Sequence, residues 1–186
     1  MKRCFDILLA LIALGFLIWP MLIVAAAVRL TSPGAAIYWS DRVGKNNALF
    51  KMPKFRSMRI DTPAVATHLL DQPEAWLTPV GSFIRKTSLD ELPQLWCILK
   101  GEMSFVGPRP ALYNQRDLIE LRTARGIHAL LPGLTGWAQI NGRDELVLAD
   151  KVRFDAEYLE RRNFNLDLLI IWRTLAQTMR AQGVSH

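Results

Sequence analysis

The hydrophobic residues of this chain are concentrated near its N-terminus, where residues 7 to 28 form an unbroken run of 22 uncharged positions. At about 1.5 Å per residue, such a run is long enough for a helix that crosses a membrane. Pro20 lies near its middle, and a proline there removes a backbone donor and clashes with the preceding turn. Each half alone would be too short to cross roughly 30 Å of hydrocarbon. We therefore favour a re-entrant helix-break-helix over residues 1–32, with a straight spanning helix as the alternative.

Basic residues flank this run on both sides. Lys2 and Arg3 precede it, and residues 29 to 60 carry seven basic residues against the single acid Asp41. Positive flanks favour placing both ends of the run in the cytoplasm. The basic block suits anionic lipid headgroups or phosphorylated ligands. A nucleic-acid-binding module would have no need of the apolar run, so we expect membrane lipid and no nucleic acid among the partners.

Beyond the apolar run, the pattern predicts a catalytic domain over residues 33–186 that is mostly α-helical with a small β-hairpin. Two β-rich runs on either side of residues 44–47 indicate the hairpin. Helical periodicity predicts helices over residues 92–99, 113–125, 146–161 and 166–180. Proline and glycine predict loops at residues 61–80, 106–110 and 131–136, the first with one helical turn. Trp172 with its flanking arginines suits an amphipathic interfacial helix, and a core helix fits the pattern nearly as well.

The cysteines and histidines do not form a metal or disulfide pattern. Cys4 and Cys97 are the only cysteines of the sequence, without CxxC spacing or paired histidines beside them. A disulfide framework or a zinc site is therefore not expected, and two reduced thiols fit a cytoplasmic compartment. His68, His128 and His186 are scattered along the chain, and we treat them as surface residues.

Candidate chemistry begins with two adjacent carboxylates, Asp90 and Glu91, a few residues after Arg85. One interpretation is helix capping, because acidic residues in a first turn satisfy free backbone N–H groups, and Ser88 and Glu91 have capping-box spacing. The other is a phosphoryl-transfer site, which needs a nucleophilic or metal-binding carboxylate close to cations that neutralise phosphate.

Three arginines are available as such cations: Arg85, Arg109 and Arg143. The planar guanidinium group can donate two parallel hydrogen bonds to a phosphate. A carboxylate at a helix N-terminus would also be kept ionised, as a nucleophile must be.

Three long motifs resemble those of the bacterial sugar transferases known as monotopic phosphoglycosyl transferases. The motifs are DELPQLW at residues 90–96, LKGEMSFVGPRP at residues 99–110 and PGLTGWAQINGR at residues 132–143. The resemblance extends over essentially the whole chain, from the lysine and arginine at positions 2 and 3 through residues 54–58 to Asp155 and Tyr158. The chain is similar to the minimal catalytic form of this family, without the additional N-terminal helices of its larger members.

The resemblance implies a ping-pong reaction that needs Mg²⁺ and takes place at the cytoplasmic face of the bacterial inner membrane. Asp90 would attack the β-phosphate of a UDP-sugar, release UMP and retain the phosphosugar as a covalent aspartyl intermediate. Undecaprenyl phosphate would then accept the phosphosugar, giving a polyprenyl diphosphate sugar that starts a glycoconjugate or polysaccharide. Glu91 would bind Mg²⁺ with Asp90 or orient it, since one or two carboxylates and a diphosphate suffice for this ion.

The other candidate residues are assigned to the substrates. Arg85 and Arg109 would bind phosphate, Gln139 and Arg143 the nucleotide or sugar, and Lys54 and Arg56 the phosphate of the carrier at the membrane surface. For each cation, the alternative is an ordinary surface charge or a contact with lipid headgroups.

Two other functions fit part of the pattern. A membrane phosphatase or pyrophosphatase would use the same aspartate and Mg²⁺ with water as acceptor, and an interaction module would carry a degenerate site. The sugar, the glycan pathway and the oligomeric state stay open, with a homodimer as one option. Trp19 stands where the family usually has serine before the proline, which leaves the re-entrant and the spanning form of the N-terminal segment both open.

Overall fold

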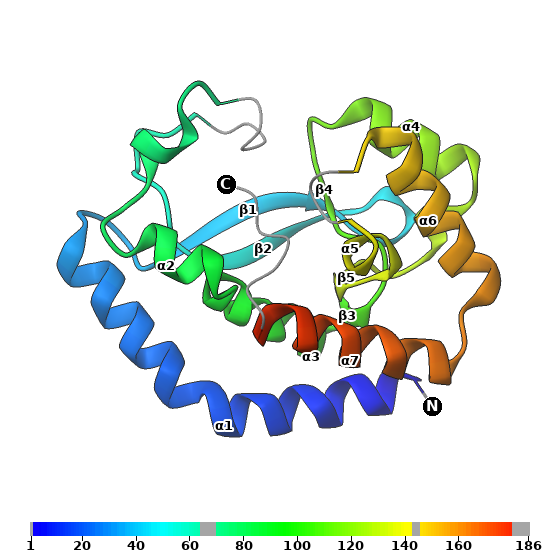
Figure 1. Ribbon diagram of the computed structural model, residues 1–186, viewed down its shortest axis with the longest axis horizontal. Coiled ribbons are helices and arrows are strands. Elements are labelled where there is room, and N and C mark those ends of the chain that lie inside the picture. Colours follow the sequence, from blue (N-terminus) through cyan, green and yellow to red (C-terminus); the bar gives the residue numbers. More distant parts are fainter. Residues whose placement is uncertain (1, 64–69, 143–145, 180–186) are drawn as a thin grey trace.

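The computed structural model describes residues 2–63, 70–142 and 146–179. Helices surround a small β-sheet, and the long N-terminal helix runs along one edge of the molecule (Figure 1). The α-helices of the described residues are α1 (Lys2–Thr31), α2 (Gly81–Lys86), α3 (Leu95–Lys100), α4 (Arg116–Ala124), α5 (Trp137–Ile140), α6 (Leu148–Arg161) and α7 (Phe164–Met179). The short 3-10 helices are η1 (Lys45–Asn47), η3 (Pro73–Trp76), η4 (Leu89–Gln94) and η5 (Ile127–Ala129). The predicted fold class, mostly helical with a small sheet, is confirmed.

The N-terminal helix α1 continues through Pro20, so the predicted helix-break-helix is replaced by one helix without a break. The helix instead bends, with its two halves at an angle to each other (Figure 1). Its N-terminal half packs into the main core through Ala10, while its C-terminal half packs through Val24 and Val28 onto a second cluster. Contacts along both halves explain why a proline that disturbs one turn does not end the helix. By length and composition, α1 could cross a membrane.

The predicted hairpin is confirmed. Strands β1 (Ile37–Val43) and β2 (Leu49–Phe55) pair antiparallel, with Tyr38 opposite Lys54 in the register. The connection contains two asparagines at positive φ, 55° for Asn46 and 61° for Asn47, a conformation that asparagine adopts more readily than most residues. Strand β4 (Ala111–Leu112) adds to the other edge of β1.

A second, two-stranded sheet lies partly within two predicted loops, since β5 falls inside residues 131–136 and β3 ends at the first residue of 106–110. Strands β3 (Ser104–Val106) and β5 (Gly133–Thr135) pair in parallel. Two further backbone hydrogen bonds extend the contact, from the Gly107 N–H to the Thr135 carbonyl and from the Gly133 N–H to the Pro108 carbonyl, each 2.9 Å. The loop prediction for residues 106–110 and 131–136 was therefore incomplete, because three-residue strands are too short for a period to be recognised.

The four predicted helices are present with shifted ends. Residues 113–125 contain α4, residues 146–161 contain α6, and α7 begins two residues before the predicted 166–180. The segment 92–99 differs most, since it divides into the end of η4 and most of α3. Pro93 lies inside η4, where its missing N–H favours a short 3-10 turn over regular α-helix. The helical turn expected within residues 61–80 is η3.

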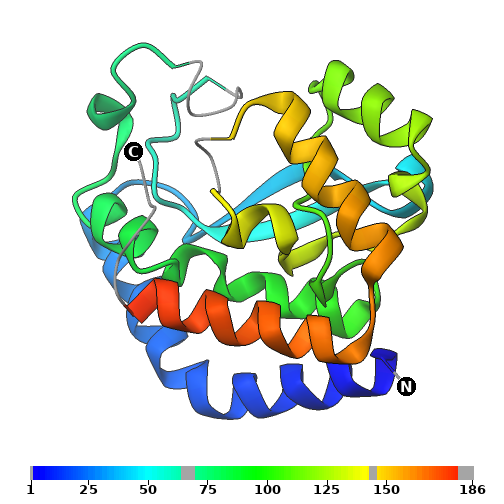
Figure 2. The same cartoon turned by 45° about the vertical axis from the view of Figure 1, so that its right-hand side comes forward.

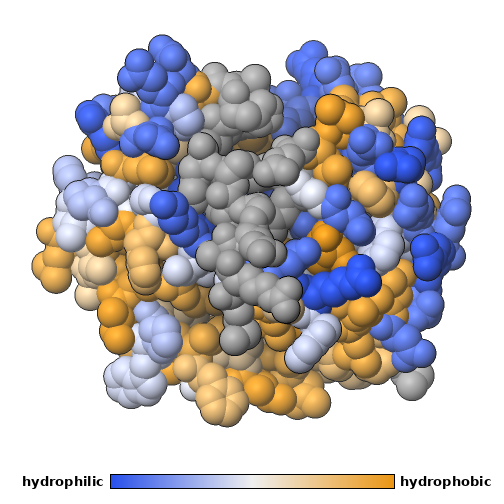
Figure 3. Space-filling model, in the orientation of Figure 1, coloured by the Kyte–Doolittle hydropathy of each residue, from blue (hydrophilic) through white to orange (hydrophobic). Residues whose placement is uncertain are grey.

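Large apolar side chains are exposed along α1 and α7. Trp19 of α1 has an exposed fraction of 72%, and Trp172 of α7 has one of 69%. The two helices lie side by side in both ribbon views (Figures 1 and 2), and the surface over them is largely apolar (Figure 3). Ile170 on the opposite side of α7 is buried, so α7 is a surface helix with one buried face. Apolar faces of this extent mark membrane or partner contacts.

The close packing of Gly107 against the backbone of residues 131–133 can be tested by substitution. In Gly107→Ala, the added Cβ would overlap the Leu131 carbonyl oxygen and lie 3.0 Å from the Gly133 nitrogen, so we expect a loss of about 1–3 kcal/mol in the free energy of unfolding. Gly15→Ala is the control, because nothing lies within 4 Å of its Cβ position and alanine favours a helix. Thermal unfolding followed by circular dichroism measures both, and equal effects would contradict the close packing at Gly107.

Candidate active site

The two carboxylates lie in η4, directly before α3. Ser88 occupies the cap with a φ of 56°, and its side chain makes no capping hydrogen bond to a described residue. Asp90 lies inside the turn and is buried, with an exposed fraction of 8%. The Glu91 side chain is bound by cations of other segments rather than by the cap. The structure therefore does not support the capping interpretation of these residues.

Glu91 is the point where three segments meet. Its Oε1 atom accepts a 2.7 Å hydrogen bond from Lys54 Nζ of β2 and a 2.9 Å bond from Arg109 Nη2, which follows β3. Lys54 Nζ also lies 4.0 Å from Asp90 Oδ2. Two cations that are far apart in the sequence are thus brought to adjacent carboxylates, as the phosphoryl-transfer interpretation requires.

The adjacent carboxylates have pKa values shifted in opposite directions. Burial raises the pKa of Asp90 to about 6, and the charge of Glu91 adds to this, while Lys54 and Arg85 act against it. For Glu91, burial also acts upward, but Arg109 and Lys54 together hold its pKa well below the usual range. Glu91 is therefore held as an anion, whereas burial destabilises the charge of Asp90 by more than the nearby cations stabilise it. Such a separation of pKa values between neighbours is typical of functional sites.

Two further arginines hold the turn that carries Arg109. Arg42 Nη1 donates to the Pro110 carbonyl at 3.1 Å, and Arg122 Nη1 donates to the Arg109 carbonyl at 2.8 Å. Arg122 is itself held by Asp155, with Nη2 at 2.6 Å from Oδ2. The carbonyls of Arg109 and Pro110 are thus each bound by an arginine from another segment. These bonds fix the backbone of the turn and so help to orient the Arg109 side chain.

Sequence reasoning counted Arg42 only as part of the basic block. In the structure it is largely buried, and desolvation followed by the charge of Arg109 lowers its pKa to about 10. The position of Arg42 in the strand could have indicated this role. Tyr38 is the partner of Lys54 across the hairpin, and Arg42 lies four residues after Tyr38, so the side chains of Arg42 and Lys54 lie on the same face. The role of Arg122 had no comparable local signal.

Two other predicted cations lie in different settings. Arg85 of α2 is close enough to Asp90 to lower its pKa, which agrees with a place at the phosphate site. Arg56 is buried, and its Nη2 donates to the Ser32 carbonyl at 3.1 Å and to Ser32 Oγ at 2.9 Å. In this structure Arg56 thus binds the chain just after α1, and sequence reasoning missed this contact.

Gln139 of α5 is buried beside the glycine backbone of the parallel strands. Its Oε1 atom would lie 2.5 Å from a Cβ at Gly136. Neither amide atom of Gln139 has a hydrogen-bond partner among the described residues, and a buried amide of this kind calls for a ligand or water. Arg143, the other residue assigned to the nucleotide or sugar, lies outside the described residues.

The carboxylate pair is compatible with Mg²⁺. Within the described part of the chain, no group of three or more His, Cys, Asp or Glu residues could enclose a metal ion. Magnesium needs less than this, because it keeps several waters and binds one or two carboxylates together with substrate phosphates. Asp90 and the second oxygen of Glu91 would supply those ligands, since Oε1 of Glu91 is engaged by Lys54 and Arg109.

The opposite pKa shifts predict opposite effects on stability. Asp90→Asn should raise the free energy of unfolding at pH 7 to 8 by about 1–3 kcal/mol, because the raised pKa of Asp90 means that the fold loses stability as the pH rises from about 4 to about 6 and stays destabilised above that. This gain should vanish below about pH 4, where Asp90 is protonated in both states. Glu91→Gln should instead destabilise the protein at neutral pH, since it leaves two cations without their partner. Thermal unfolding measured across pH gives the stability of both variants. Changes of the same sign in their free energies of unfolding at neutral pH would contradict the opposite pKa shifts of Asp90 and Glu91.

The chain matches a known family over nearly its full length. A family model described as bacterial sugar transferase covers residues 1–181. The chain is 36% identical to the exopolysaccharide production protein ExoY of Sinorhizobium fredii, over 98% of this chain and 87% of that protein. It is 38% identical to the uncharacterized sugar transferase EpsL of Bacillus subtilis, over 100% of this chain and 91% of that protein.

A longer relative is similar at the same level. The chain is 42% identical to the UDP-glucose:undecaprenyl-phosphate glucose-1-phosphate transferase of Escherichia coli, over 94% of this chain and 39% of that protein. The chain therefore spans well under half of this relative. Together with the family match, the three motifs and the paired carboxylates assign the chain to the family of bacterial sugar transferases, to which it belongs.

Proposed function

We propose that the protein transfers a phosphosugar from a UDP-sugar to undecaprenyl phosphate, with Asp90 as a covalent nucleophile. The observation that carries this proposal is the buried Asp90, whose neighbour Glu91 is held between Lys54 and Arg109. The name of the Escherichia coli relative supports the two substrates. A phosphatase or pyrophosphatase is the less favoured alternative, because the family to which the chain belongs consists of sugar transferases.

The proposed reaction has two steps at one phosphorus atom. In the first, a carboxylate oxygen of Asp90 forms a bond to the β-phosphorus of the UDP-sugar, and the bond from that phosphorus to the bridging oxygen breaks. UMP leaves with the electron pair. In the second, a phosphate oxygen of undecaprenyl phosphate attacks the same phosphorus and releases the Asp90 carboxylate. Two steps at one site let two bulky, highly charged substrates react in turn.

The cations around the carboxylates would neutralise the diphosphate. Arg109 keeps an exposed side-chain fraction of 42% while it contacts Glu91, so a phosphate in solution can approach this side chain. Arg85 would bind the same group from α2, and Lys54 would meet the phosphate of the carrier. Bound Mg²⁺ would supply further positive charge at the diphosphate, with Asp90 and Glu91 as its protein ligands.

The remaining substrate contacts are assigned to three residues. Gln139 would use its unpartnered amide for the nucleotide or sugar, and Arg143 is proposed for the same part of the donor. Arg56 is proposed for the carrier phosphate, although its contact with Ser32 would then have to be shared with the ligand. The names of the ExoY relatives support exopolysaccharide synthesis as the pathway that the product would enter.

The exposed apolar faces of α1 and α7 would hold the protein in the cytoplasmic leaflet of the bacterial inner membrane. A bent helix with basic residues at both ends suits re-entry from the cytoplasm, and the exposed Trp172 of α7 suits the headgroup region. This monotopic arrangement would bring the water-soluble donor and the lipid carrier to one surface, with residues 1–32 in the membrane and residues 33–186 as the catalytic part.

The covalent step can be tested by mass. With undecaprenyl phosphate, Mg²⁺ and a panel of UDP-sugars, one donor should release UMP and yield a lipid-linked sugar. Without the carrier, the intact protein should gain the mass of one phosphosugar. Asp90→Asn should lose the adduct and at least about 10⁴-fold in rate, as nucleophile removal does elsewhere. An Asn variant that still makes lipid-linked sugar would exclude this mechanism, and release of inorganic phosphate without a lipid product would favour the phosphatase.

Metal dependence is tested separately. Chelation with EDTA should abolish UMP release, because the negative charge of the donor diphosphate would then be neutralised by the arginines and the lysine alone; added Mg²⁺ should restore it. Glu91→Gln should require more Mg²⁺ for half-maximal activity than the parent protein. Full activity in EDTA would rule out the proposed role of the metal.

A further inference from the structure

The first turn of α1 contacts three separate segments of the catalytic fold. Arg3 reaches α3, where its Nη1 donates to the Ile98 carbonyl at 2.5 Å and its Nη2 to the Leu99 carbonyl at 2.8 Å. These carbonyls lie in the last turn of α3, where helical partners run out, although the Ile98 carbonyl also accepts a hydrogen bond from the Gly101 N–H. Arg3 therefore binds the C-terminal end of α3 with both arms of its guanidinium group.

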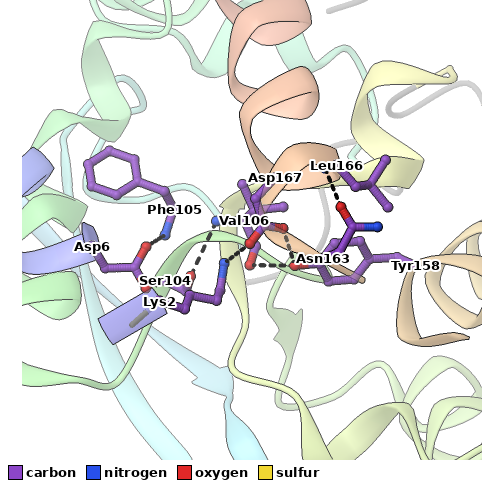
Figure 4. A network of polar contacts seen from close by, with 9 residues as sticks. All are labelled: Lys2, Asp6, Ser104, Phe105, Val106, Tyr158, Asn163, Leu166 and Asp167. Atoms are coloured by element: carbon purple, nitrogen blue, oxygen red, sulfur yellow. Dashed lines mark hydrogen bonds and ion pairs between the residues drawn. The ribbon is translucent and has the colours of Figure 1, made fainter. Parts of the chain in front are cut away.

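Three residues after Arg3, Asp6 binds the strand β3 (Figure 4). Its Oδ2 atom accepts a 2.9 Å hydrogen bond from Ser104 Oγ, and its Oδ1 atom accepts a 3.2 Å bond from the Phe105 N–H. Asp6 has an exposed fraction of only 2%. A buried carboxylate is costly unless it is hydrogen-bonded, so these two bonds tie α1 firmly to the strand.

A third contact joins the same turn to α7 and α6 (Figure 4). Lys2 Nζ lies 2.6 Å from Asp167 Oδ2, and the Tyr158 hydroxyl donates to Asp167 Oδ1 at 2.6 Å. Burial and the neighbouring carboxylate of Asp167 raise the pKa of Tyr158, so the hydroxyl keeps its proton and stays a donor. The contact with Asp167 thus holds the beginning of α1 against the surface helix α7.

Two of these three segments lead directly to the active site. Helix α3 continues η4, which carries Asp90 and Glu91. Strand β3 ends three residues before Arg109, whose Nη2 donates to Glu91. The spacing of α3 and β3 at their common contact with α1 therefore helps to set the spacing of the two groups that meet at Glu91.

We infer that Arg3 and Asp6 are positioning residues of the active site, through which the first turn of α1 sets the placement of η4 against the Arg109 turn. This inference rests on the proposed function only in naming that site as catalytic. It gives Arg3 a role distinct from the positive charge that the sequence suggested for membrane orientation. A charge alone could equally be lysine, whereas two carbonyls held at once need the guanidinium fork.

Arg3→Lys keeps the positive charge but loses the guanidinium fork, so it separates membrane orientation by charge from the binding of the two carbonyls. Asp6→Asn keeps the volume of the side chain but loses one acceptor. Cys4→Ala is the matched control, because Cys4 lies in the same turn and is exposed. The full-length protein is studied by hydrogen–deuterium exchange without substrate, and then by steady-state transfer kinetics. Both variants should exchange severalfold faster in residues 89–94 and 104–112, and their kcat should fall about 10- to 100-fold with the donor KM within about threefold.

The control should match the parent in both measurements. Normal exchange and kcat in Arg3→Lys and Asp6→Asn would overturn the inference, and so would faster exchange spread evenly over the whole chain, which indicates general destabilisation. The exchange measurement does not depend on the reaction. A parent protein that transfers no phosphosugar from any donor would therefore reject the proposed function, while the exchange pattern would still decide whether the first turn of α1 holds these two segments.

Discussion

The site depends on Glu91 Oε1, which accepts hydrogen bonds from both Lys54 and Arg109. The Glu91 side chain has an exposed fraction of 17%, so its charge would be unfavourable without partners, and each partner comes from a different segment of the chain. The hairpin, η4 and the Arg109 turn are therefore held together by one anion. Asp90 lies farther from Lys54, with 4.0 Å between Nζ and its Oδ2 atom, and burial raises its pKa to about 6. A residue that lowers the stability of the fold in order to serve the active site is a common cost of function.

Arginine side chains support this arrangement mainly by binding backbone carbonyls. Arg42 and Arg122 hold the turn around Arg109, Arg3 holds the end of α3, and Arg56 holds the chain after α1. The guanidinium group suits this task because it has five donors, remains charged and is planar. Part of the strong positive charge of the chain is therefore used inside the fold. Only the remainder is available for phosphate and lipid headgroups.

Helix α1 combines an apolar surface with a structural role at the site. Its exposed side chains form one face with α7, while its buried residues reach two different core clusters on either side of the bend. The polar first turn then contacts α3, β3 and α7. The proposed attachment to a membrane and the geometry of the active site would thus be linked through a single helix.

Elements with a local signal could be predicted from the amino-acid sequence alone. The apolar run, the hairpin and the amphipathic helices follow from periodicity and turn residues, and the pair Asp90 and Glu91 follows from motifs that identify the family. Only the folded chain shows that Pro20 bends α1 without breaking it, that residues 104–106 and 133–135 form strands, and that Arg42 and Arg122 hold the Arg109 turn. These features depend on contacts between residues that are far apart in the chain. Local sequence does not predict such contacts, because the same side chain can bind solvent, lipid or a backbone carbonyl, depending on what the fold places beside it.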